Sequence, residues 1–173
     1  ADRNPSRTIS QMAPDWEVVD SEGVFLSPHS LSKKVTVLYF WGTWSPLCKK
    51  ATPEVALLAK DYADKSVEIV SMAIRDGSPD IVVKAARDQG QTWRQVPAAD
   101  DAAVLLGVRV VPSVVVLDAQ GQVLFKSGRP KGNDYNALYA KVRSTIDNAL
   151  AGKPAKQISV RKTGMPAPKK PGK

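Results

Sequence analysis

Cysteine and histidine, which carry much of the redox, metal and nucleophilic chemistry of proteins, are almost absent from the chain. Cys48 is its one cysteine and His29 its one histidine. A single cysteine excludes an internal disulfide and excludes a zinc site built from several thiolates. His29 stands in a turn-like stretch, 26–34, where we expect it to face solvent and not to act as a catalytic base. The composition therefore predicts no metal site and no cofactor.

Long apolar runs are also missing, since none approaches the roughly 20 residues that cross a bilayer. The hydrophobic content is 43%, which can build the core of one domain. The opening stretch ADRNPSRTISQ is polar and begins with Ala1. It fits an exported leader, a spacer after a removed membrane anchor, or a chain trimmed for expression.

Acidic residues are absent from the C-terminal end. Residues 152–173 carry seven Lys or Arg side chains and four prolines, so the net charge of +8 leaves only +1 for residues 1–151. A segment of this composition buries too little apolar surface to offset its ordering entropy. We predict an extension over residues 1–12, one folded domain over 13–151 and a basic tail over 152–173.

The pattern of the domain predicts an α/β fold, a sheet with helices on both sides. Continuous apolar and β-branched runs predict buried strands, and periodic apolar residues predict helices. Ser45 is the expected N-cap of the first helix and Pro46 its first residue. The strands are expected at 35–41, 67–74, 112–118 and 122–128. The other helices are expected at 78–90, 100–107 and 133–150.

Three stretches carry a family resemblance: APDWEVVDSEGVFLSPHSL, VTVLYFWGTWSPLCKKATPE and LLGVRVVPSVVVLDAQGQVL. In this order and spacing, from about Ala13 to Leu150, the chain resembles the TlpA/ResA/CcmG group of thioredoxin-like proteins. The resemblance implies a thioredoxin fold with a central mixed β-sheet flanked by helices. It also implies a periplasmic or otherwise exported protein whose relatives reduce or exchange disulfides in exported proteins.

The resemblance also assigns roles to the stretch Ser45-Pro46-Leu47-Cys48. Ser45 stands where the family has its attacking cysteine, and Cys48 where it has the resolving one. A hydroxyl is not acidic enough to replace a thiolate, and no histidine adjoins it as a base. Ala51 stands where many relatives have a glutamate that helps proton transfer. Dithiol exchange is therefore not expected from this chain, and whether it is an enzyme is left open.

The resemblance places a peptide-binding groove beside Pro112. It implies a cis bond between Val111 and Pro112, and a backbone at Val111 that pairs with an extended substrate. Trp44 and Pro46 are the expected neighbours of this groove, with Trp44 as an aromatic wall.

Two origins explain the serine: natural loss of redox function, which Ala51 favours, or an engineered cysteine-to-serine change.

Three functions stay open. The chain is an inactive member of the oxidoreductase family, a redox-inactive module that binds peptides or docks onto a complex, or a monothiol sensor that uses Cys48. Expected partners are exported proteins or peptides in the groove. The tail suits an acidic protein surface or an anionic membrane, whereas the lack of interleaved aromatics disfavours nucleic acid.

Overall fold

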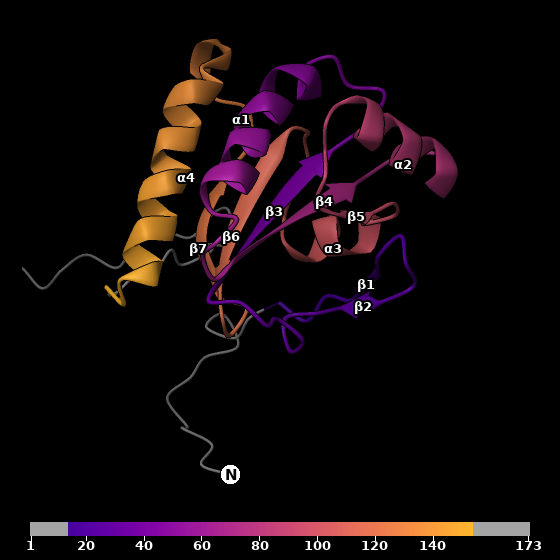
Figure 1. Ribbon diagram of the computed structural model, residues 1–173. Helices are drawn as coiled ribbons and strands as arrows, with labels where there is room; N and C mark the ends of the chain where they lie inside the picture. The colour runs from indigo at the N-terminus through magenta and orange to yellow at the C-terminus, as the bar shows by residue number, and fades with distance from the viewer. Residues whose placement is uncertain (1–13, 154–173) are drawn as a thin grey trace, which may run out of the picture.

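The structure is a computed structural model that describes residues 14–153. Its centre is a five-stranded sheet with the strand order β5-β4-β3-β6-β7. The strands are β3 (Val35–Trp41), β4 (Val67–Ala73), β5 (Arg94–Val96), β6 (Ser113–Asp118) and β7 (Val123–Ser127). The predicted thioredoxin fold with a mixed central sheet is confirmed (Figure 1).

Strand β3 forms the middle of the sheet. Its residues are apolar or aromatic at all positions but Thr36, and all seven are buried. It runs parallel to β4, with Val35 opposite Val67, and antiparallel to β6, with Phe40 opposite Ser113. A strand covered on both faces has the continuous apolar sequence seen here.

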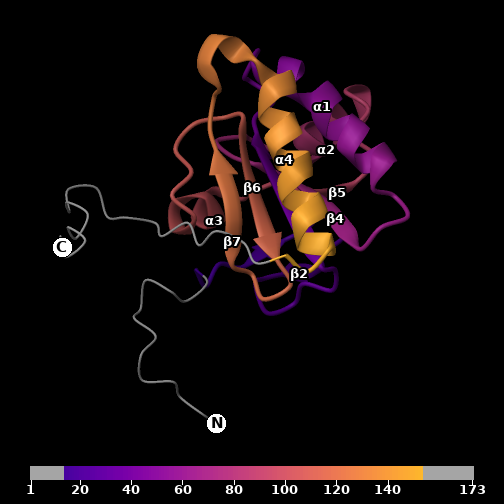
Figure 2. The ribbon, with the colours of Figure 1, turned by 90° about the vertical axis from the view of Figure 1, so that its left-hand side faces the viewer.

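Helices cover both faces of the sheet, as the sequence predicts. Figure 2 shows α1, α2 and α4 on one face and α3 on the other. Their bounds are α1 (Cys48–Asp61), α2 (Pro79–Asp88), α3 (Asp100–Leu105) and α4 (Tyr135–Leu150), with a short 3₁₀ turn η2 (Lys131–Asn133) before α4. Helix α2 begins with a local start signal, because Ser78 is its N-cap and Pro79 its first residue.

The predicted start of the first helix is wrong. Helix α1 begins at Cys48, its N-cap is Leu47, and no side chain caps it. The amide of Cys48 donates to the carbonyl of Ser45 at 3.2 Å, which closes a tight turn of the 3₁₀ type. The first α-type bond runs from Ala51 to Leu47 at 3.3 Å. Ser45 therefore begins a turn and does not cap the helix with its hydroxyl.

The sequence reading missed the small elements at the β5 edge, which are too short to show a periodicity. Strands β1 (Val18–Val19) and β2 (Phe25–Leu26) form a two-stranded hairpin. Asp20 in the loop between them receives the Nε–H of Arg94 on β5 at 2.7 Å, and Arg94 also pairs with Glu68 on β4 at 3.0 Å. These two partly buried ion pairs hold the hairpin against the sheet.

Two expectations lie outside the described residues: the extension over 1–12 and most of the basic tail, including its docking. Across residues 14–153, no helix combines the length and the apolar character that crossing a membrane requires.

Candidate functional site

The site is built around Cys48, the first residue of α1. Its side chain is 1% exposed, so the thiol lies in the core beneath the turn that begins at Ser45. The hydroxyl of Ser45, the backbone N–H of Gly42 and the hydroxyl of Tyr39 lie near the sulfur and favour its ionised form. Burial raises the pKa of Cys48, and these groups together with the charge of Arg129 offset only part of the rise. The thiol is therefore protonated at neutral pH.

Ser45 and Cys48 are brought together, as the family spacing requires, but both are buried. Ser45 is 3% exposed, whereas Pro46 and Trp44 on either side of it are exposed. The hydroxyl of Ser45 lies beside the sulfur and adds an oxygen where a dithiol would need a second sulfur. The pair can share a proton or a hydrogen bond, and it cannot form an internal disulfide.

A polar cluster lies beneath Cys48 on the inner side of α1. The hydroxyl of Tyr39 on β3 donates to the Cys48 carbonyl at 3.0 Å and lies 2.9 Å from the hydroxyl of Thr52. Thr52 also donates to the Cys48 carbonyl, at 2.8 Å. Burial is the largest cause of the raised pKa of Tyr39. Together these bonds fix the first turn of α1 on the central strand. Ala51 is buried here, and it provides no carboxylate for proton transfer.

Trp44 does not lie against Cys48. Its indole Nε1–H donates to the carbonyl of Ile74 at 3.1 Å, and the guanidinium of Arg75 lies 5.1 Å from the centre of its ring. A Cβ at Gly42 would lie 2.5 Å from Nε1 of Trp44, so only glycine lets the indole approach the backbone this closely. The ring is 46% exposed and presents one face to solvent. Its place in the groove stays a prediction.

Val111 and Pro112 are both buried, and the peptide bond between them is cis. The carbonyl of Val111 accepts the Nε–H of Arg129 at 2.9 Å. Pro112, Tyr135 and Tyr139 are among the residues that line a gap between this end of β6 and α4, which is too narrow to hold a water molecule. The hydroxyl of Tyr135 is buried and has no hydrogen-bond partner. Burial raises its pKa. Tyr135 therefore lies beside Pro112 with a buried, unpartnered hydroxyl.

The sequence reading missed the side chains that connect these parts. Arg75, Arg129 and Tyr135 lie in a loop, after a strand and on a helix, and none belongs to a motif with a fixed spacing. The positive φ of Arg75, 52°, also has no signal in a sequence that lacks glycine or asparagine there. The one histidine lies elsewhere: His29 is exposed and 3.6 Å from Asp15. Among residues 14–153 no group of three His, Cys, Asp or Glu side chains could hold a metal ion.

The sheet, the helices around it and the cysteine in the first turn of α1 define a thioredoxin-fold protein of the thiol–disulfide oxidoreductase type. A family model described as Redoxin matches residues 9–140, and the chain belongs to this family. Within it the chain is TlpA/ResA/CcmG-like. It is 32% identical over 120 residues to the thiol-disulfide oxidoreductase ResA of Bacillus thuringiensis (strain Al Hakam), covering 67% of each protein.

Solved structures show the same fold. A secreted disulfide oxidoreductase of Mycobacterium tuberculosis, homologous to DsbE of Escherichia coli, matches with a TM-score of 0.61 and 20% identity over 75% of this chain and 96% of that one. A hypothetical protein of Sinorhizobium meliloti 1021 matches with a TM-score of 0.70 and 18% identity over 90% of this chain and 91% of that one. At these identities the likeness concerns the fold alone.

Proposed function

We propose that this chain holds an extended segment of another protein beside Val111 and Pro112 and does not carry out dithiol exchange. The observation that carries the proposal is the oxygen at position 45, next to the one cysteine. Exchange requires a thiolate that attacks a disulfide sulfur and a second thiol that resolves the mixed disulfide. Ser45 provides neither, because its hydroxyl is a poor nucleophile without a neighbouring base.

The state of Cys48 supports a binding role over a monothiol sensor. A reactive cysteine is exposed and has a depressed pKa, which keeps part of it as thiolate at neutral pH. Cys48 is 1% exposed and its pKa is raised by burial. It packs as a core residue beneath the turn at Ser45, where an oxidant or a client disulfide does not reach it without an opening of the turn.

The surface around the Pro112 loop suits an extended peptide. Trp44 and Val110 are 46% and 40% exposed, so both offer apolar contact to a bound side chain. The carbonyl of Val111 already accepts one bond from Arg129, and a carbonyl oxygen has a second lone pair for a peptide N–H. Main-chain pairing of this kind provides affinity with little sequence preference, which suits a holder of varied clients.

We place this function outside the cytoplasm, on exported proteins. The likeness to a ResA supports this. The basic tail, with seven cationic side chains and no acid, serves to dock the domain on an acidic protein surface or an anionic membrane.

The redox part of the proposal is tested by insulin-disulfide reduction with the chain, Ser45→Cys and the matched control Ser45→Ala. The chain and Ser45→Ala should be inactive, and Ser45→Cys should gain turnover because it restores a pair of sulfurs. If the chain itself turns over catalytically, the proposal is wrong. If Ser45→Cys folds and stays inactive, restoring the cysteine is not enough to restore exchange. That result would favour a role in binding alone.

The holding part is tested with a fluorescent extended peptide whose anisotropy reports binding. Trp44→Ala should weaken binding by about tenfold, since aromatic anchors carry much of the energy of such contacts. Phe25→Ala is the matched control, because Phe25 is an aromatic side chain that is 63% exposed and lies in the β1–β2 hairpin at the β5 edge of the sheet. Equal binding by the two variants would show that the peptide does not lie against Trp44.

A further inference from the structure

Three cationic side chains converge on the backbone segment 107–111, which leads into Pro112. The Nζ of Lys126 donates to the carbonyl of Gly107 at 2.8 Å, Nη2 of Arg75 to the carbonyl of Arg109 at 3.3 Å, and Nε of Arg129 to the carbonyl of Val111 at 2.9 Å. The three acceptors are alternate residues of one stretch. The segment that we expect to receive a client is therefore bound by a cationic side chain at every second carbonyl.

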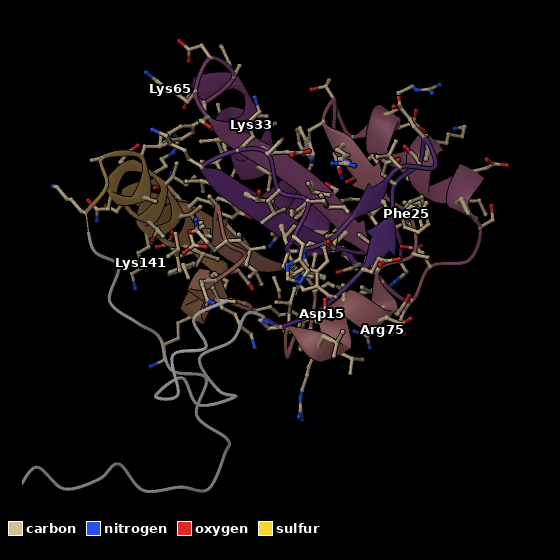
Figure 3. The ribbon with its side chains drawn as sticks, turned by 90° about the horizontal axis from the view of Figure 1, so that it is seen from below. Asp15, Phe25, Lys33, Lys65, Arg75 and Lys141 are labelled. Atoms are coloured by element: carbon tan, nitrogen blue, oxygen red, sulfur yellow. The ribbon has the colours of Figure 1, made fainter. Side chains whose placement is uncertain are left out.

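The cations come from separate parts of the chain, so the tertiary fold assembles them. Arg75 follows β4, Lys126 lies on β7, and Arg129 lies between β7 and α4. Figure 3 shows Arg75 beside α3, far from α4, and its backbone N–H donates to Asp100 of α3 at 2.9 Å. A Cβ at Gly107 would lie 2.7 Å from Nζ of Lys126, so glycine leaves the space that the ammonium group occupies.

A fourth cation, Arg109, belongs to the segment itself. Burial lowers the pKa of Lys126, and the positive charge of Arg109 lowers it further, which shows that the two like charges lie near one another. We call Arg75, Arg109, Lys126 and Arg129 the basic rim. All but Lys126 are exposed. Each donor that reaches a carbonyl keeps further N–H groups, because a guanidinium has five and an ammonium three.

Among residues 14–153, no carboxylate forms an ion pair with the basic rim. Within the described part of the chain, the ion pairs involve other cations: His29, Lys84, Arg94 and Arg143. Two acids of the neighbouring loops accept hydrogen bonds from nearby groups. Asp76 accepts the N–H and the hydroxyl of Thr43, and Asp100 accepts the N–H of Arg75. Four like charges around one segment, in a region (residues 1–151) whose whole net charge is only +1, indicate a binding partner of opposite sign.

We propose that the basic rim selects an acidic segment of the protein that is held at the site. This inference rests on the proposed function, and it adds the class of client: an extended stretch whose Asp and Glu side chains meet the rim. An apolar side chain of the same stretch then reaches Trp44, whose ring already stacks with Arg75. The chain's own C-terminal stretch is an unsuitable occupant, because residues 152–173 carry seven positive charges and no negative one.

The test uses two fluorescein-labelled extended peptides with the same apolar centre, one flanked by Asp and Glu and the other by Lys. Binding to the full chain is measured by anisotropy at about 0.05 M and about 0.3 M salt, because screening weakens contacts between exposed charges. The acidic peptide should bind about tenfold more tightly at low salt and lose most of this advantage at high salt. Arg109→Glu should remove the preference, since its side chain reverses sign without deleting one of the three bonds to the segment.

Arg87→Glu on α2 is the matched control and should leave the preference unchanged, because Arg87 is exposed on the opposite face of the sheet from α3. Equal binding of the two peptides would overturn the inference and leave the holding function intact. Failure of both peptides to bind would overturn the holding function, and this inference with it. A single-stranded oligonucleotide and vesicles of phosphatidylglycerol with phosphatidylcholine are run beside them. Tighter binding of either, lost in Arg109→Glu, would overturn the acidic segment as the occupant.

Discussion

The Nε of Arg129 donates to the carbonyl of Val111 at 2.9 Å, while the charge of the same guanidinium acts on the thiol of Cys48. One side chain thus couples the residue before Pro112 to the first residue of α1. Replacing Arg129 should therefore affect both the Val111 carbonyl and the Cys48 thiol.

Replacing Arg129 with Met should raise the pKa of Cys48 further, because a nearby cation favours the thiolate and its removal disfavours it. The free energy of unfolding should fall by about 1–2 kcal/mol as the Val111 carbonyl loses a charged donor. The NMR shift of the Cys48 β-carbon against pH measures the first effect, and urea unfolding measures the second. Lys131→Met removes the same charge from an exposed neighbour and should change neither. An unchanged titration of Cys48 in Arg129→Met would show that the two groups are not coupled.

Gly42→Ala should displace the indole of Trp44, because the added Cβ would lie 2.5 Å from its Nε1. Loss of the bond to the Ile74 carbonyl and local overpacking should together cost about 1–3 kcal/mol of unfolding free energy. Chemical denaturation gives the cost, and the indole N–H resonance of Trp44 shows whether the bond is broken. Gly77→Ala is the control, since nothing lies within 4 Å of a Cβ built there. An undisturbed indole resonance in Gly42→Ala would contradict this account of the close approach.

Asp20→Asn should destabilise the chain by about 2–3 kcal/mol at neutral pH, because it removes the charge that pairs with partly buried Arg94. Burial alone would raise the pKa of Asp20, but bonds from the Val24 amide and from Arg94 lower it overall. A carboxyl whose pKa is lower in the folded state stabilises that state above its unfolded value, near 3.9, and loses this contribution as pH falls through the folded value.

The wild-type chain should therefore lose stability below about pH 4 more steeply than Asp20→Asn. Urea unfolding from about pH 5 to about pH 2 compares the two slopes. Asp88→Asn is the control, because the exposed Lys84–Asp88 pair should contribute less than about 0.5 kcal/mol. Parallel pH profiles for wild type and Asp20→Asn would show that Asp20 is not the group responsible.

The predicted and observed elements agree best where the signal is local. Ser78 before Pro79 sets the start of α2 through a cap and a proline that need no distant partner. Ser45 before Pro46 has the same local pattern, yet α1 starts at Cys48. There the turn must also connect a buried central strand to the helix, and its backbone closes in 3₁₀ bonds before the α pattern begins. The path of the chain from the buried strand into α1 therefore decides where this helix starts, and the local capping pattern does not.

By itself the sequence determined the fold class, the order of the main strands and helices, and the presence of oxygen beside a single sulfur. Those features follow from apolar runs, helix periodicity and short motifs, all of which act over neighbouring residues. Only the tertiary structure decided that Cys48 is buried, that Trp44 turns to Ile74, and that three cations meet at residues 107–111. Such contacts join groups 18 to 34 positions apart, and no pattern along the chain encodes which distant carbonyl a flexible basic side chain will reach.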